Sequence, residues 1–172
     1  MESTILRGDH LLAVKWAYGW REPGLRRVVF GRRRPTRGEL VAFLFPEDRS
    51  RAFLMRLIGL PGETVEIRDK TVLVDGEPLD EPYAQFLEAP VGHDGVAEHT
   101  IQPNRLRDNF GPVEVPADAC FVLGDNRDHS RDSRYWGFVE QTDLLGRATV
   151  VCWSWDSGDV QVRWERIGRR LQ

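Results

Sequence analysis

Short runs of apolar residues, separated by polar residues, glycine and proline, form the main pattern along this chain. Runs of about four to eight residues bounded by turn-forming residues are typical of strands. The runs that we interpret as strands are residues 10–18, 40–45, 52–58, 119–123, 147–155 and 160–164. Residues 40–45 are nearly all apolar, which indicates a strand that is covered on both faces. The pattern predicts a mainly β protein.

Two further strands are indicated by a spacing of two. Val65 and Ile67, and again Val72 and Val74, lie two residues apart on either side of the polar residues 68–71. This arrangement predicts an antiparallel hairpin, and the dipeptide Asp75-Gly76 predicts a turn after it. We therefore expect the fold to be built from antiparallel sheets.

Two long segments carry no periodic pattern. Residues 19–38 are dense in Arg, Gly and Pro, which predicts an exposed loop. Residues 78–112 are polar with scattered Pro, Gly, His and Asn, which indicates a loop-rich excursion. We divide the chain into a core formed by residues 1–62 and 113–172 and an inserted hairpin with a small lobe at 63–112.

Composition narrows the possible functions. The 172 residues are 41% hydrophobic and 30% charged, which suits one domain with its own core. The net charge of -3 argues against a nucleic-acid partner, since such proteins usually carry a basic face. Lys15 and Lys70 are the only lysines, so a catalytic lysine has few possible positions. No apolar run reaches the roughly 20 residues that span a bilayer.

Residues 124–134, a polar loop after the apolar run 119–123, have an unusual density of charges and hydroxyls. One interpretation is structural, with Asp, Asn and Ser bonding their own backbone and Arg pairing with Asp. A triad of His129, Ser130 and Asp132 is the other, but residues this close in sequence point in different directions. The loop is the best candidate for a functional segment, and the residues alone leave its use open.

Metal and nucleotide sites are disfavoured. The four histidines, His10, His93, His99 and His129, have no spacing typical of zinc ligands. Residues 59–62 (GLPG) read as a turn, because the proline removes an amide donor that a phosphate would need. We expect no metal and no cofactor. Cys120 and Cys152 form no CxxC pair, and the sequence does not decide whether they are bonded.

Five segments, taken together, resemble the motifs of bacterial type I signal peptidases, which are serine peptidases with a Ser-Lys dyad. They are residues 2–9 (ESTILRGD), 37–43 (RGELVAF), 53–62 (FLMRLIGLPG), 124–137 (GDNRDHSRDSRYWG) and 146–149 (GRAT). The fourteen-residue segment is the most specific of them. The resemblance extends over nearly the whole chain and implies the mainly β fold of the extracytoplasmic domain of that family.

The resemblance also implies that both catalytic residues are absent from this chain. The general-base lysine of the family aligns with Met55, whose thioether has no useful basicity near neutral pH. The family's nucleophilic serine aligns with the position directly before Met1. Lys15 as a substitute base and Ser3 as a substitute nucleophile are both disfavoured against ordinary surface positions. We expect the chain as written to be inactive.

The remaining residues of the resembling site are present. By likeness to the family, Ser130 would hydrogen-bond the base, and Asp132 and Arg134 would form an ion pair that holds the loop. An extended substrate would lie against Phe53, Leu54 and Met55.

For the function, the resemblance implies removal of signal peptides from exported preproteins after small residues such as Ala-x-Ala. The partners are then signal peptides and the cell membrane, reached through an upstream anchor, with the domain on the extracytoplasmic (periplasmic) side. The alternative is an inactive member that binds signal peptides or an envelope partner. A self-cleaving repressor-type protease lacks support, because no DNA-binding helices precede the domain.

Two groups of residues have both a membrane and an ordinary interpretation. Trp153 and Trp155 suit either the bilayer interface or the core. The arginines at 26–27 and 32–34 suit either anionic headgroups or a solvated loop.

Overall fold

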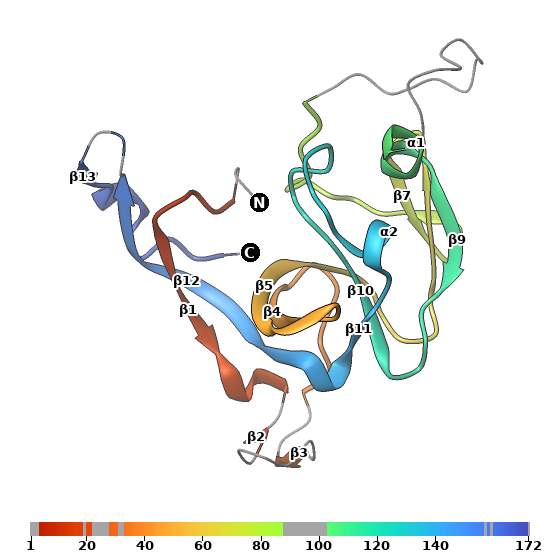
Figure 1. Ribbon diagram of the computed structural model, residues 1–172, viewed down its shortest axis with the longest axis horizontal. Helices are drawn as coiled ribbons and strands as arrows, with labels where there is room; N and C mark the ends of the chain where they lie inside the picture. Colours follow the sequence, from red (N-terminus) through yellow and green to blue (C-terminus); the bar gives the residue numbers. More distant parts are fainter. Residues whose placement is uncertain are drawn as a thin grey trace.

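The computed structural model describes residues 4–18, 20–21, 28–30, 33–87, 103–156, 158 and 160–171. Within these ranges a large antiparallel sheet dominates (Figure 1). Its strand order is β1 (Asp9–Val14), β12 (Leu144–Asp156), β4 (Leu40–Phe45), β5 (Asp48–Gly59), β10 (Ala119–Leu123) and β11 (Val139–Glu140), and β13 (Gln161–Val162) pairs with β12. The expectation of a mainly β fold with antiparallel sheets is confirmed.

A second antiparallel sheet lies beside β10 and holds the predicted hairpin (Figure 1). Its order is β8 (Glu77–Pro78), β7 (Thr71–Val74), β6 (Thr64–Arg68) and β9 (Phe110–Glu114). Asp75 and Gly76 have φ values of 52° and 84°, so the predicted turn after β7 uses the left-handed region. The division into a core and a lobe at residue 63 stays a prediction.

Shorter elements complete the fold. Strands β2 (Trp20–Arg21) and β3 (Val28–Phe30) form a small two-stranded antiparallel sheet. The helices are α1 (Pro103–Asp108) and α2 (Ser133–Trp136), with 3-10 turns η1 (Lys15–Tyr18), η2 (Gln141–Asp143) and η3 (Trp164–Arg166). In the part of the chain that the structure describes, no helix is long and apolar enough to cross a membrane.

The buried apolar side chains form three clusters. Successive side chains of a strand point to opposite faces of the sheet, so one strand contributes to more than one cluster. The first cluster has as members Tyr18, Val41, Phe43, Leu57, Cys120, Val122, Val139 and Leu144. The second cluster joins the two sheets and contains Ile58, Val65, Ile67, Val72, Val74, Val115, Phe121 and Leu123. The third cluster contains Leu40, Ala148, Val151 and Leu171. The consecutive residues Leu57 and Ile58 thus belong to different clusters.

The predicted strands at 40–45 and 119–123 match β4 and β10. The strand predicted at 10–18 ends at Val14, because residues 15–18 form a 3-10 turn that carries Tyr18 into the first cluster. The strand predicted at 160–164 is only two residues long and gives way to η3.

The two predicted loops contain regular structure that apolar periodicity does not reveal. Segment 19–38 holds β2 and β3, and segment 78–112 holds α1 and the start of β9. Residues 88–102 of that predicted excursion lie outside the described residues. Cys120 is buried and Cys152 is exposed, and both are free thiols.

Candidate functional site

Strand β5 has one edge that is only partly covered. On one side β4 pairs along it, with Phe43 opposite Phe53, Ala42 opposite Leu54 and Val41 opposite Met55. On the other side β10 pairs only with the last part of β5, from Arg56 to Gly59. Among the residues that the structure describes, no strand pairs with this side of β5 at residues 52–55. We call this segment the open edge.

Met55 ends the open edge on the side of β10. Its half-buried side chain packs against the first cluster, as does that of Phe53. Leu54 faces the other side of the sheet and packs against the third cluster. The three residues expected to contact a substrate are therefore consecutive on the open edge, but only Phe53 and Met55 share a face.

Ser130 lies close to Met55 through the start of the polar loop. Leu123 is opposite Arg56 in the pairing of β10 with β5, so the register places the next residue, Gly124, beside Met55. A Cβ atom at Gly124 would be only 2.2 Å from the Ser130 Oγ, so this hydroxyl lies directly over the Gly124 backbone. The expected proximity of Ser130 to position 55 is compatible with this geometry, and its contact with a base stays a prediction.

The carboxylate of Asp132 closes the polar loop on itself. It accepts hydrogen bonds from the Arg134 Nε and Nη2 at 2.8 Å each and from the Gly124 backbone amide at 3.1 Å. Arg134 also donates to the carbonyl oxygens of Arg107 and Arg127, at 2.9 and 2.7 Å. The bond from the Gly124 amide to Asp132 thus joins the two ends of the loop, and the support of a base by the ion pair of Asp132 with Arg134 stays a prediction.

Ion pairs from other segments hold the remaining charges of the loop. Asp125 pairs with Arg56 of β5 at 2.8 Å, and Arg127 pairs with Glu81. Asp128 pairs at 2.8 Å with Lys70, whose side chain is 7% exposed. Sequence reasoning missed these partners, because each pair joins residues at least 46 positions apart. The only hint was the density of charge in the loop.

Two other catalytic candidates, His129 and Lys15, lie within the described residues. His129 is exposed, while the Asp132 carboxylate is bound to Arg134 and the Gly124 amide, so the geometry gives no support to a Ser-His-Asp triad. Lys15 is an exposed residue of η1. Met1 and Ser3 lie outside the described residues.

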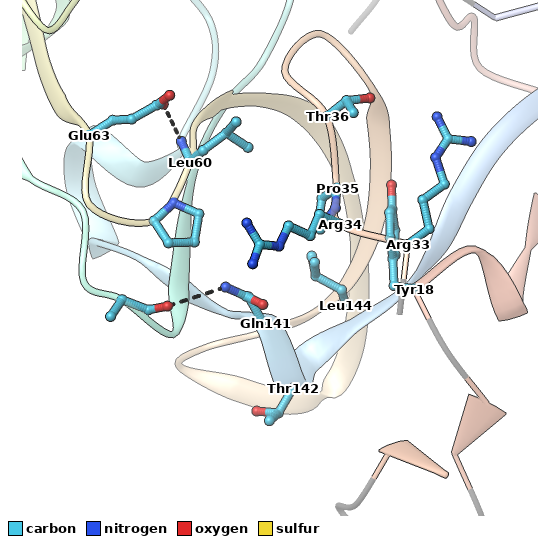
Figure 2. A pocket seen from close by; sticks show the side chains of 12 residues that line it. Tyr18, Arg33, Arg34, Pro35, Thr36, Leu60, Glu63, Gln141, Thr142 and Leu144 are labelled. Carbon is cyan, nitrogen blue, oxygen red and sulfur yellow. Dashed lines mark hydrogen bonds between the residues drawn. The ribbon is translucent and has the colours of Figure 1, made fainter. Parts of the chain in front are cut away.

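A pocket of about 820 Å³ lies away from the open edge (Figure 2). Figure 2 shows the Arg34 side chain extending into the space between Leu60 and Gln141. Tyr18 lines the pocket and donates to Glu39 Oε2 at 2.9 Å; burial, followed by the nearby negative charge of Glu39, raises the pKa of this phenol. The phenol of Tyr18 therefore stays neutral in this pocket and is bound to Glu39.

Exposed tryptophans gather at the far end of β12 from the first cluster. Trp153 and Trp155 are 40% and 37% exposed, and Trp164 of η3 is 71% exposed. The rings of Trp153 and Trp164 are 6.1 Å apart in an edge-to-face arrangement. This is more exposed aromatic surface than a core position would leave.

Comparisons with known proteins agree on one family. The family model described as "Signal peptidase, peptidase S26" matches residues 1–153. The "Probable signal peptidase I-2" of Synechocystis sp. is 38% identical over 89% of this chain, and the "Signal peptidase I" of Pseudomonas aeruginosa is 34% identical over 90%. The chain spans 59% and 62% of the length of these two curated relatives.

A solved structure gives the same result. The crystal structure of a signal peptidase I from Enterococcus faecalis V583 is similar to 67% of this chain and to 97% of its own chain. The TM-score is 0.51, and the two sequences are 36% identical. The likeness therefore covers both fold and sequence.

Proposed function

Since this chain belongs to the signal peptidase family, peptidase S26, we propose that it binds the C-terminal part of signal peptides along the open edge of β5. The family activity, removal of signal peptides from exported preproteins after residues such as Ala-x-Ala, is our proposal for the whole protein. We propose that residues 1–172 alone do not perform it, because Met55 occupies the position where the resemblance places the lysine of the dyad.

The open edge is the observation that carries this proposal. Within the described ranges, only β4 pairs with residues 52–55, so the backbone amides and carbonyls on the opposite side of this segment have no strand partner. An extended peptide can form main-chain hydrogen bonds with these groups. The side chains of Phe53 and Met55 project from one face of that edge. Such an edge accepts a peptide backbone of any sequence and selects it by the space left for alternate side chains.

Met55 explains the proposed lack of cleavage. Acyl transfer needs a nucleophile, a base that takes its proton, and donors that stabilise the oxyanion. A lysine at position 55 would pack against the apolar first cluster, and partial burial of this kind lowers a lysine pKa below its ordinary value. Met55 fills the same apolar surroundings and accepts no proton.

The test restores both members of the dyad. A variant with Met55→Lys and a short leader ending in serine directly before Met1 should cleave a fluorogenic peptide that contains Ala-x-Ala. The parent chain, Met55→Lys alone and the serine leader alone serve as matched controls and should not cleave it. Cleavage by the parent chain, or a folded double variant that leaves the peptide intact, would contradict the proposal.

The second candidate is a protein that binds signal peptides or an envelope partner without cleaving them. The presence of Met55 at the base position favours it. To decide between the two candidate functions, the experiment uses the natural protein, including any residues that precede Met1. Peptide binding measured by fluorescence anisotropy, with no product after long incubation, favours the binder, whereas turnover that a serine substitution abolishes removes it.

We also propose that the domain works at the extracytoplasmic face of the cell membrane. The exposed rings of Trp153, Trp155 and Trp164 support this, because aromatic side chains favour the region of the lipid headgroups. Binding to lipid vesicles that weakens in a Trp153→Ala, Trp164→Ala double variant is the expected result. Equal binding of the parent and this variant would contradict it.

A further inference from the structure

A small polar pocket of about 350 Å³ lies next to the end of the open edge. The residues that matter for its chemistry are Thr4, Arg56, Tyr83, Gln85, Arg169 and Arg170. Three of these carry a guanidinium, and no carboxylate is among the described residues that line the pocket. We call it the arginine pocket.

The charges in the arginine pocket do not cancel. The charge of Arg56 is balanced by Asp125, which also accepts a hydrogen bond from the Thr4 hydroxyl. Arg169 and Arg170 are exposed, and neither forms an ion pair with any residue in the described ranges. Two positive charges are therefore available to a ligand with negative charge.

The two arginines are presented by a well-held segment. The Arg169 carbonyl accepts from the Val151 amide at 3.0 Å, and Arg170 forms an antiparallel bridge with Val150. Leu171, 5% exposed, belongs to the third cluster. The backbone that carries both side chains is thus fixed against β12.

A peptide on the open edge must leave the sheet near this pocket. β10 pairs with β5 from Arg56 onward, so a strand that lies along residues 52–55 cannot continue past Met55. In our proposal the peptide residues before the scissile bond lie along the open edge, and the scissile bond lies at Met55. The peptide residues that follow the scissile bond then lie beyond Met55. The next residue of β5, Arg56, lines the arginine pocket together with Thr4.

We propose that Arg169 and Arg170 bind acidic side chains in the first few residues after the cleavage position. The two arginines then determine specificity, because a glutamate there gains an ion pair that a glutamine lacks. This inference rests on the proposed function of the open edge, and the experiment is designed so that the two fail separately.

The experiment compares two peptides that differ only in charge. Both contain the same apolar segment and Ala-x-Ala, followed by Glu-Glu in one peptide and by Gln-Gln in the other. The parent chain should bind the Glu-Glu peptide about fivefold more tightly at low salt, as expected for two partly exposed ion pairs. About 0.5 M salt should remove most of this preference by screening.

Variants assign the preference to the pocket. The double variant Arg169→Gln, Arg170→Gln should bind both peptides equally, and as tightly as the parent binds the Gln-Gln peptide. The control Arg68→Gln removes an exposed charge from the second sheet, where Arg68 pairs with Glu66, and should keep the preference.

Other outcomes overturn the inference. If the parent binds both peptides equally, or the double variant keeps the preference, the arginine pocket does not select acidic residues, although the open edge still binds peptides. If the parent binds neither peptide, the proposed function fails as well. If the peptides bind equally and the double variant loses binding to phosphatidylglycerol vesicles, the pocket takes a lipid headgroup instead.

Discussion

Arg56 of β5 and Asp125 of the polar loop form a completely buried ion pair. The Arg56 Nε and Nη2 lie 3.1 and 2.8 Å from the two oxygens of the Asp125 carboxylate, and neither side chain is more than 1% exposed. The Arg56 Nη1 also donates to the Gly38 carbonyl at 2.7 Å. The pair therefore links the strand that carries the open edge to the loop that carries Ser130.

Asp125→Asn should be strongly destabilising. The substitution leaves the Arg56 charge buried without a counter-charge, which costs about 3 kcal/mol in comparable sites. The free energy of unfolding, measured by urea titration, should fall by that amount. Glu66→Gln is the matched control, because Glu66 pairs with Arg68, which is 65% exposed, and its loss should cost less than about 1 kcal/mol. If both substitutions lowered the free energy of unfolding by the same amount, burial of the ion pair would not explain the cost of losing it.

Acid should weaken the attachment of β1 to η3. Burial on its own raises the pKa of Asp9, but hydrogen bonds from Arg166 and Ser154 outweigh it and lower this pKa from 3.8 to about 2. Because the folded-state pKa is lowered, the stabilisation is fully present above about pH 4 and is lost as the pH falls towards 2.

The effect of Asp9 is measurable by comparison with Asp9→Asn. A shift of this size corresponds to about 2 kcal/mol, which solvent screening reduces to about 1 kcal/mol. The parent should be more stable than the variant at pH 7, and this gap should narrow by about that amount between pH 4 and pH 2 in urea titrations. A gap that stays constant over this range would show that Asp9 keeps its ordinary pKa.

Gly124→Ala should disturb the polar loop through one contact. The added Cβ would lie 2.2 Å from the Ser130 Oγ and 2.7 Å from the Ser130 Cβ, so the loop must shift, at a cost of about 1–3 kcal/mol. Ser130→Gly removes both of these atoms. The double variant Gly124→Ala, Ser130→Gly should therefore recover most of the stability in thermal unfolding, and absence of recovery would contradict the close approach of these residues.

Met55→Lys should make stability depend on pH in the alkaline range. The first cluster favours the neutral amine, so the folded-state pKa of the new lysine falls below its unfolded value of about 10.4. The variant should be about 1–2 kcal/mol less stable than the parent at pH 7, and the difference should shrink as the pH rises towards 10. Met55→Gln, which is polar but uncharged, should show a difference that does not change with pH. The same behaviour for both variants would mean that the site is well hydrated.

The sequence predicted the strands that are determined by local pattern. Residues 40–45 and 119–123 are apolar runs between turn-forming residues, and they form β4 and β10 with those limits. Residues 15–18 also look like part of a strand, but they form a 3-10 turn, and their Tyr18 makes a tertiary hydrogen bond to Glu39 that the local pattern does not contain. Periodicity therefore fails where a distant partner decides the conformation.

The candidate site was predictable in part. Met55 and Ser130 were found because their motifs resemble those of a known family, whereas no local signal indicated that β10 stops pairing at Arg56 and leaves the open edge. The partners of the loop charges, such as Lys70 for Asp128, depend on how separate segments meet in space. Arg169 and Arg170 look like ordinary surface residues until the structure places them beside Thr4.

The position of β12 between β1 and β4 has a consequence for the order of folding. β1 begins at Asp9, but its partner among the described strands is β12, which ends at Asp156. Strand β1 therefore cannot find its place until the much later segment that forms β12 is also present. Pairing over such a sequence distance is slow, and strands that wait for partners are prone to aggregation. We expect this domain to need protection by chaperones while it is being made.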